Sequence, residues 1–292
     1  MIGRSAPPPL ARATLPQRIE MVVLDLDGTC LDFHQGLHPR VEEAVRQAGG
    51  RVPVVIATGR MYRSALPWAR RLGVHAPLIC YQGALIQAMP NPDPGEGLAY
   101  GPLIHTEILD GDTARLAIDV AREHGWHRQA YVDDTLLCEE DRIEARAYAH
   151  VGAVSIRFVD DLAAAVAGGT VKVVCVILDP EEARRCREAM SAALGARARV
   201  TPSLPQFLEV ASPHAGKGPA VVRVARDLGV ELSRVAAVGD APNDVDMLEA
   251  VGFGVAVEGA LEEVLEAAAC TCPPPDQAGV ADVLTALGLA TA

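Results

Sequence analysis

An apolar run near the N-terminus of the chain ends abruptly in two carboxylates. Residues 22–29 read Val-Val-Leu-Asp-Leu-Asp-Gly-Thr. A buried strand would keep acids out, because a desolvated charge is costly unless it is paired or bound to a metal. Side chains at i and i+2 of a strand point the same way, so Asp25 and Asp27 would share one face at the strand's carboxyl end. Two close carboxylates attract a hard cation such as Mg²⁺, and one of them can act as a nucleophile. The alternative is that both acids only cap a loop or a helix.

The composition predicts a two-domain protein. With 292 residues, half of them hydrophobic, the chain can bury a substantial core. It has no apolar run of about 18 residues or more, which argues against a transmembrane helix. Residues 1–19 lack the apolar core of a signal peptide, so we expect a flexible N-terminal extension on a cytoplasmic protein. The formal charge of −12 argues against nucleic acid or an anionic membrane as a partner.

The order of strand and helix signals predicts an α/β fold. Strands and helices alternate over residues 20–83 and again over 206–292, which indicates a doubly wound parallel sheet with helices on both faces. Residues 84–205 change character and predict an inserted α+β domain. We therefore expect a catalytic core made of two separate segments, with a second domain inserted between them.

Four short motifs fall at the predicted strand ends or in loops. They are the acidic pair of residues 25–29, Thr58-Gly59-Arg60, Lys217 in a glycine-rich loop, and Gly239–Asp244. Lys217 stands out because the chain has only one other lysine, Lys172, which we interpret as incidental to a strand. The carboxyl ends of parallel strands lie along one edge of a sheet, so the four motifs are expected to converge.

The residues of these motifs fit transfer of a phosphoryl group. Asp25 would attack phosphorus and form an aspartyl phosphate, while Asp27 would protonate the leaving oxygen and later deprotonate a water. Mg²⁺ would be held by Asp25, Asp27, Asp240 and a backbone carbonyl. Thr58, Lys217 and backbone N–H groups such as that of Gly59 would bind the phosphoryl oxygens.

Purely structural interpretations stay open for several of these residues. Thr58, Asp240 and Asn243 could each cap a following helix. Arg60 and Gln82 are possible substrate contacts, but Arg60 could simply be exposed in a first helical turn. In the inserted domain, three further side chains are possible substrate contacts: Arg128, Tyr131 and Arg157.

Together, the four motifs resemble those of the haloacid dehalogenase superfamily, and specifically of its Cof-type phosphatases. The resemblance covers the chain from about Met21 onward. It implies a Rossmann-like core with an inserted α+β cap of type C2B that sets substrate specificity. By position, Asp25 matches the nucleophile, Asp27 the general acid/base, Thr58 and Lys217 the phosphate ligands, and Asp240 a metal ligand. Asn243 and Asp244 match supporting residues of the metal motif.

The residue at position 27 selects a branch of that superfamily. Its dehalogenases lack an acid there and its P-type ATPases carry a threonine, whereas an aspartate points to phosphatases and phosphomutases. One departure is Gln82-Gly83-Ala84, where many relatives have Asn-Gly-Ala. Asn-Gly-Ala lies near the cap entrance or the rim of the active site, so the departure weakens any transfer of substrate by analogy.

The resemblance implies a cytoplasmic, Mg²⁺-dependent phosphatase that acts on a small phosphorylated metabolite. A sugar phosphate is the leading substrate class, and the protein is expected to be a monomer or a homodimer. Two alternatives stay open: a phosphomutase, and a catalytically silent sensor of a phosphorylated metabolite. Product analysis would separate the first, and tight binding without turnover would indicate the second.

Overall fold

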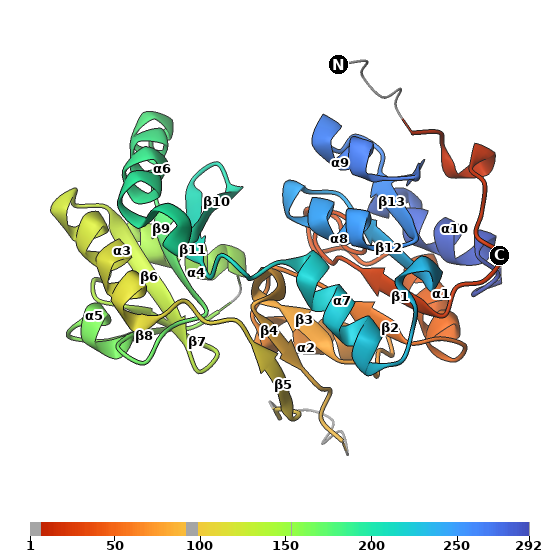
Figure 1. Cartoon of the computed structure of the whole chain (residues 1–292), viewed down its shortest axis with the longest axis horizontal. Helices are drawn as coiled ribbons and strands as arrows, with labels where there is room; N and C mark the ends of the chain where they lie inside the picture. The colour runs from red at the N-terminus through yellow and green to blue at the C-terminus, as the bar shows by residue number, and fades with distance from the viewer. Residues whose placement is uncertain (1–6, 92–98, 153, 292) are drawn as a thin grey trace. The chain divides into compact units, whose positions relative to one another are not determined.

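The computed structural model describes residues 7–91, 99–152 and 154–291, which form two compact units. The first unit holds the described residues of Met1–Gly59, Ala65–Ile104 and Gly216–Ala292, and the second holds those of Arg60–Ser64 and His105–Ala215 (Figure 1). The expected insertion over residues 84–205 thus differs at both ends from the second unit. It starts later because β4 (Leu85–Gln87) pairs with β3 (Leu78–Cys80) inside the first unit.

A five-stranded parallel sheet forms the centre of the first unit, in the order β14-β13-β12-β1-β2. From β1 the chain adds β2 on one side and later returns to add β12, β13 and β14 on the other. That arrangement is the predicted doubly wound sheet, and it puts a topological switch point between β1 and β12. The strands are β1 (Met21–Leu24), β2 (Val54–Ile56), β12 (Val235–Gly239), β13 (Phe253–Val257) and β14 (Cys270–Cys272).

Both faces of this sheet are buried, which explains why its strands are apolar throughout instead of alternating. Met21 and Val23 of β1 pack with residues of α7, α8 and α9, and strand alternation turns their neighbours to the opposite face. Burying one such side chain contributes about 1.5–3 kcal/mol. The helices of this unit are α1 (Pro39–Gly49), α2 (Tyr62–Arg71, of which the part from Ala65 belongs to this unit), α7 (Lys217–Asp227), α8 (Val245–Ala250), α9 (Glu262–Ala267) and α10 (Gly279–Ala286), with short 3-10 turns η4 (Leu232–Arg234), η5 (Pro242–Asp244) and η6 (Pro275–Gln277).

A second, three-stranded sheet continues the first unit, in the order β3-β4-β5. A bridge between Ala57 and Ile79 places β3 beside the end of β2. The 3-10 turn η2 (Tyr81–Gly83) connects β3 to β4, and β5 (Leu103–Thr106) completes the sheet. The turn η2 is therefore held close to the residues that follow β2.

Part of the expected flexible extension is packed against the sheet. The carbonyl of Pro8 accepts a hydrogen bond from the N–H of Thr271 in β14 at 3.0 Å, and Pro9 forms a bridge with the same residue. The short turn η1 (Leu10–Arg12) follows. The structure therefore differs from the expectation of a flexible extension over this segment. The reason is that β14 is an edge strand, whose outer backbone groups are available for pairing with residues 8 and 9. Residues 1–6 of the extension lie outside the described residues.

The second unit is built on a six-stranded sheet, in the order β10-β11-β9-β6-β7-β8. All its pairings are antiparallel except that of β7 with β8. Helix α6 starts where Asp179 accepts hydrogen bonds from the N–H groups of Glu181 and Glu182, with Pro180 in the first turn. The elements are α3 (Gly111–Glu123), β6 (His127–Val132), β7 (Thr135–Cys138), α4 (Ile143–Gly152), β8 (Ile156–Phe158), α5 (Leu162–Ala165), β9 (Lys172–Val176), α6 (Pro180–Leu194), η3 (Gly195–Arg197), β10 (Arg199–Leu204) and β11 (Phe207–Ala211).

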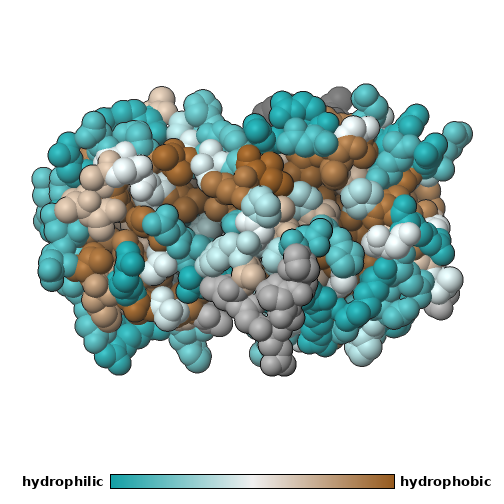
Figure 2. All heavy atoms as spheres, turned by 90° about the horizontal axis from the view of Figure 1, so that it is seen from below, coloured by the Kyte–Doolittle hydropathy of each residue, from teal (hydrophilic) through white to brown (hydrophobic). Residues whose placement is uncertain are grey.

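The surface and the helix lengths agree with the composition. Hydrophilic residues cover much of the face drawn in Figure 2. Among the helices that the structure describes, none has both the length and the apolar character needed to cross a membrane. All seven cysteines are unpaired and buried, so no disulfide supports the fold.

Candidate active site

Asp25 lies directly after β1, at the carboxyl edge of the parallel sheet. Its backbone N–H donates to the carbonyl of Val238 in β12 at 3.1 Å, and the residue is only 5% exposed. Asp27 is exposed, and its Oδ1 accepts a hydrogen bond from Gln35 Nε2 at 3.2 Å. Because β1 ends at Leu24, strand alternation does not extend to Asp27. The two acids of the motif therefore lie in different surroundings, one buried and one at the surface.

Gly28 allows the loop after β1 to approach Asp240 closely. Its φ is +86°, and a Cβ at this position would lie 2.2 Å from Asp240 Oδ2. The neighbouring Thr29 donates its hydroxyl hydrogen to Asp240 Oδ1 at 2.8 Å. Glycine and threonine thus join the first motif to the last, which explains why both follow the acidic pair.

Lys217 is the first residue of α7 and is fully buried. Its Nζ lies 2.6 Å from Asp25 Oδ1 and 2.6 Å from Asp244 Oδ1. One ammonium therefore pairs with two buried carboxylates that are far apart in the sequence. Of the chain's two lysines, this one lies in the predicted site, as its loop suggested.

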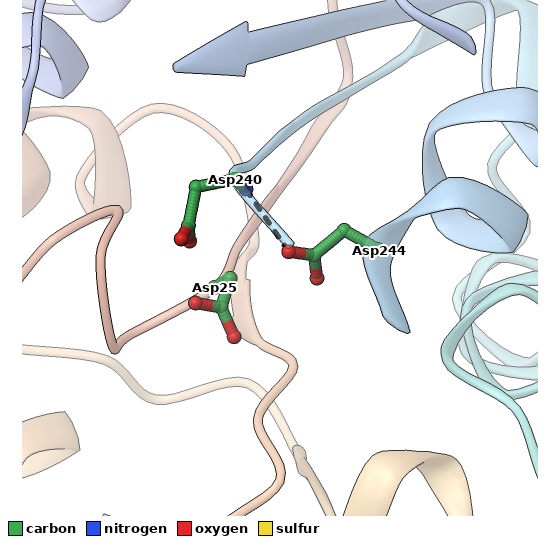
Figure 3. A group of neighbouring side chains, drawn as sticks. All are labelled: Asp25, Asp240 and Asp244. Carbon is green, nitrogen blue, oxygen red and sulfur yellow. Dashed lines mark hydrogen bonds between the residues drawn. The ribbon is translucent and has the colours of Figure 1, made fainter. Parts of the chain in front are cut away.

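Asp244 organises the loop that follows β12. Its Oδ2 accepts hydrogen bonds from the N–H groups of Asp240 and Ala241, both at 3.0 Å, and Figure 3 shows the first of them. With Lys217 on Oδ1, both oxygens of this carboxylate are engaged. Asp244 therefore fixes the position of the Asp240 loop relative to the ammonium of Lys217.

Burial and the crowding of charges shift the ionisation of the group. Burial raises the pKa of Asp25 well above its ordinary value, and the nearby Lys217 ammonium offsets this only in part. Burial also raises the pKa of Asp240, to about 6, against the opposing hydrogen bond from Thr29. Burial alone would lower the pKa of Lys217, but the carboxylates of Asp244 and Asp25 raise it above its ordinary value. Three ionised carboxylates beside one ammonium would leave excess negative charge, and the raised pKa values indicate that this state is unfavourable without a further cation.

The carboxylates of Asp25, Asp240 and Asp244 could hold a metal ion. One oxygen from each lies within 4.8 Å of the others, and Figure 3 shows all three gathered from the loops after β1 and β12. An all-oxygen donor set suits a hard divalent cation, which would also offset the excess negative charge. Asp25 and Asp240 fit direct ligation best, because both Asp244 oxygens are already bonded. The side chain of Asp27, which we expected among the ligands, is not part of this group.

The second motif and the metal motif meet at Gln82. Thr58 follows β2, is fully buried, and donates its backbone N–H to the carbonyl of Ile79 at 2.9 Å. A Cβ on Gly59 would lie 2.5 Å from Gln82 Nε2, and Gln82 Oε1 accepts a hydrogen bond from Asn243 Nδ2 at 2.8 Å. The structure therefore brings all four sequence motifs to the same edge of the sheet in the first unit.

Other expected contacts lie outside this cluster. Arg60 belongs to the second unit, so its contact with substrate stays a prediction. In that unit Arg128 is paired with Glu139 and with Glu140 (3.1 Å), Tyr131 is buried, and Arg157 is exposed. Arg128 and Tyr131 thus have partners inside the protein that the sequence did not reveal, and their contact with substrate stays a prediction.

The sequence also missed two contacts in the site. Thr29 stood in the quoted motif without a role, although a hydroxyl after Asp-Gly is a signal for a polar contact. Gln35, the hydrogen-bond donor to Asp27, lies in a loop where no pattern marks it. It adopts a left-handed backbone conformation, with φ of 63°.

Comparison with known proteins identifies the family. Residues 22–284 match the model of the haloacid dehalogenase-like hydrolases. The chain is 28% identical over 270 residues to a phosphoglycolate phosphatase of Archaeoglobus fulgidus, covering 92% of this chain and 96% of that protein. It is 27% identical over 249 residues to an HMP-PP phosphatase of an Enterobacter species, with coverages of 84% and 86%.

Solved structures agree with the fold. A protein from Thermotoga maritima is 28% identical, with a TM-score of 0.79 over 91% of this chain and 97% of that one. A sugar phosphatase of haloacid dehalogenase subclass IIB is 19% identical, with a TM-score of 0.77 over 92% and 99%. The predicted fold class, an α/β core with an inserted cap, is therefore confirmed. The chain belongs to the haloacid dehalogenase-like hydrolases and, within them, to the Cof-type phosphatases, which are phosphoric monoester hydrolases.

Proposed function

We propose that this phosphatase is Mg²⁺-dependent and hydrolyses a small phosphorylated metabolite through an aspartyl phosphate on Asp25. The observation that carries the proposal is the pairing of Lys217 with both Asp25 and Asp244 at 2.6 Å. It holds one Asp25 oxygen in place, while among the described residues no hydrogen bond is made to the other, Oδ2. A buried, oriented carboxylate with one uncommitted oxygen is suited to nucleophilic attack.

In the first half-reaction Asp25 Oδ2 forms a bond to phosphorus while the ester P–O bond breaks. Asp27, at the surface end of the motif, donates its proton to the leaving alcohol oxygen. Thr58, the N–H of Gly59 and Lys217 stabilise the negative charge on the phosphoryl oxygens. A divalent cation held by Asp25 and Asp240 would supply further charge stabilisation and favour the ionised form of Asp25.

In the second half-reaction water replaces the alcohol. Asp27, now a carboxylate, takes a proton from the water as its oxygen bonds to phosphorus, and the Asp25–phosphorus bond breaks. Inorganic phosphate leaves and both aspartates return to their starting states. The hydrogen bond from Gln35 to Asp27 Oδ1 supports this role, because it orients the acid/base without burying it.

We propose a sugar phosphate as the leading substrate class, with phosphorylated cofactors or nucleotides next. The names of similar phosphatases support a small phosphorylated metabolite, since they include phosphoglycolate and HMP-PP as substrates. Phosphate release from a panel with one sugar phosphate, phosphoglycolate, one nucleotide and one phosphorylated cofactor tests this ranking. A cytoplasmic location and a monomeric or homodimeric state stay predictions, testable by cell fractionation and light scattering.

The test of the mechanism compares wild type with Asp25→Asn on p-nitrophenyl phosphate and Mg²⁺. Asp32→Asn is a matched control, because Asp32 accepts hydrogen bonds from the N–H groups of His34 and Gly36 and an asparagine oxygen can do the same. We expect background turnover for Asp25→Asn, normal turnover for the control, and loss of wild-type activity on chelation of the metal. Comparable turnover by wild type and Asp25→Asn would exclude Asp25 as the nucleophile.

A further inference from the structure

The turn η2 adopts an unusual backbone conformation. Tyr81, Gln82 and Gly83 have consecutive φ values of 51°, 57° and 92°, all in the left-handed region. Only glycine adopts this region without strain, and neither a tyrosine nor a glutamine is favoured there. Non-glycine residues persist in such a conformation only when the surrounding structure holds them, and they concentrate at functional sites.

Three of the four motif loops hold this turn. The N–H of Gln82 donates to the carbonyl of Thr58 at 3.1 Å, which fixes it to the phosphate-binding loop after β2. A Cβ on Gly83 would lie 2.0 Å from the carbonyl oxygen of Gly216, so the turn packs directly on the peptide before Lys217. The third contact is the hydrogen bond between Gln82 Oε1 and Asn243 Nδ2 at 2.8 Å.

The hydrogen bond to Gln82 engages one end of the Asn243 amide, the donor Nδ2. The other end is the carbonyl oxygen Oδ1. This oxygen is buried, and within the described part of the chain it has no hydrogen-bond donor. A buried acceptor needs a hydrogen-bond donor, which a phosphoryl oxygen cannot supply, so the contact of Asn243 that bears on the site is its hydrogen bond to Gln82.

We infer that Gln82 is a positioning residue for phosphate binding, which acts by joining the phosphate-binding loop of Thr58 and Gly59 to the Asn243 loop. The inference rests on the proposed function and adds to it a residue outside the four motifs. Its side chain spans the gap between the Thr58–Gly59 loop and the Asn243 loop, so it fixes the spacing of the two walls of the site. Loss of the Oε1 acceptor breaks this link, so the loop proposed to bind the phosphoryl oxygens is no longer held at a fixed spacing from the Asn243 loop.

Two substitutions separate this role from a merely structural one. Gln82→Met keeps the length of the side chain and its packing over Gly59 but removes the acceptor. Gln82→Asn is more compatible with the left-handed backbone, because asparagine is enriched there, but its amide is one methylene too short to reach Asn243. If Gln82 had only a structural role, Gln82→Asn would bind phosphate as tightly as wild type or more tightly. A positioning role predicts weaker phosphate binding in both variants.

The experiment measures kcat and KM with p-nitrophenyl phosphate and Mg²⁺, and the Kd of inorganic phosphate by calorimetry. We expect both variants to raise KM and the phosphate Kd about tenfold, the size of one lost hydrogen bond to a buried polar group, with kcat changed less than about threefold. Gln47→Met is the matched control, because Gln47 is also half-buried and hydrogen-bonded, to Glu43 and Thr291, and it should leave all three constants unchanged.

A double-mutant cycle tests the route through Asn243. We expect Gln82→Met combined with Asn243→Ala to bind phosphate no more weakly than Asn243→Ala alone, because Asn243→Ala already breaks the link that Gln82 makes. Wild-type phosphate affinity in both Gln82 variants, or additive losses in the cycle, would overturn the inference. If wild type released no phosphate from any ester, the proposed function would fail, while phosphate calorimetry on the same variants would still decide the role of Gln82.

Discussion

Replacement of Lys217 by methionine is the perturbation with the largest predicted consequence for stability. The side chain is fully buried, and its Nζ lies 2.6 Å from both Asp25 and Asp244. At that distance and an effective dielectric constant of about 20, each attraction is about 6 kcal/mol before the cost of desolvation is counted. Methionine preserves most of the volume, so the change removes charge and leaves the packing largely intact.

The net loss of stability depends on the carboxylates that remain after the substitution. Two buried carboxylates are left without their cation, and breaking a buried ion pair in this way costs about 3–5 kcal/mol. That loss is a large part of a typical unfolding free energy of about 5–15 kcal/mol. We therefore expect urea-induced unfolding in the presence of a chelator to show a loss of at least about 3 kcal/mol, and Lys217→Met to be inactive.

Two further variants control this measurement. Lys172→Met removes the chain's other lysine, which is also buried and pairs with Glu209 at 2.8 Å in the second unit. It should lower stability but leave turnover of p-nitrophenyl phosphate near wild type. Adding Asp244→Asn to Lys217→Met neutralises one uncompensated carboxylate and should restore part of the stability. An unfolding free energy for Lys217→Met within about 1 kcal/mol of wild type would show that the buried pairs of Lys217 do not stabilise the fold.

Two other predictions concern a glycine and the response to pH. Gly83→Ala should abolish phosphate release and lower the melting temperature, because its Cβ would lie 2.0 Å from a backbone oxygen; normal activity and melting in this variant would contradict the packing of η2. Folding raises the pKa of Asp240 from an ordinary 3.8 to about 6, so in metal-free protein the stability from this group is fully present below about pH 3.8 and lost as pH rises through about 6. Mg²⁺ binds the ionised carboxylate, so it should raise the melting temperature more at about pH 7.5 than at about pH 5, and an equal rise at both would argue against Asp240 as a ligand.

The fold and the main site residues could be predicted because they depend on strong local signals. The apolar strands 21–24 and 235–239 are each followed directly by an acid, and parallel strands bring their carboxyl ends together whatever the details of packing. A lysine in a glycine-rich loop of a chain with only two lysines was an equally local signal for Lys217. The convergence of Asp25 and Asp240 followed from topology alone, because each follows one of two neighbouring parallel strands.

What the sequence did not reveal depends on tertiary contacts. Strands β4 and β5 extend the sheet that β3 begins in the first unit, and nothing in their residues specifies that pairing. In the sequence Pro8 and Pro9 look like part of a flexible extension, but in the structure they pair with the edge strand β14. Arg128 suggests a substrate contact by its charge, but the structure pairs it with Glu139 and Glu140. Partners such as these are chosen by three-dimensional proximity, which one sequence does not contain.

The most direct test of the central claim is chemical trapping of the intermediate on Asp25. Wild-type protein turning over p-nitrophenyl phosphate with Mg²⁺ is quenched with borohydride, which reduces an acyl phosphate to the alcohol, and the peptide that carries residue 25 is sequenced by mass spectrometry. The account predicts conversion of Asp25 to homoserine, only when substrate is present, and no such conversion at Asp27 or Asp240. Active enzyme in which Asp25 stays unmodified, or in which another aspartate is reduced instead, would contradict it.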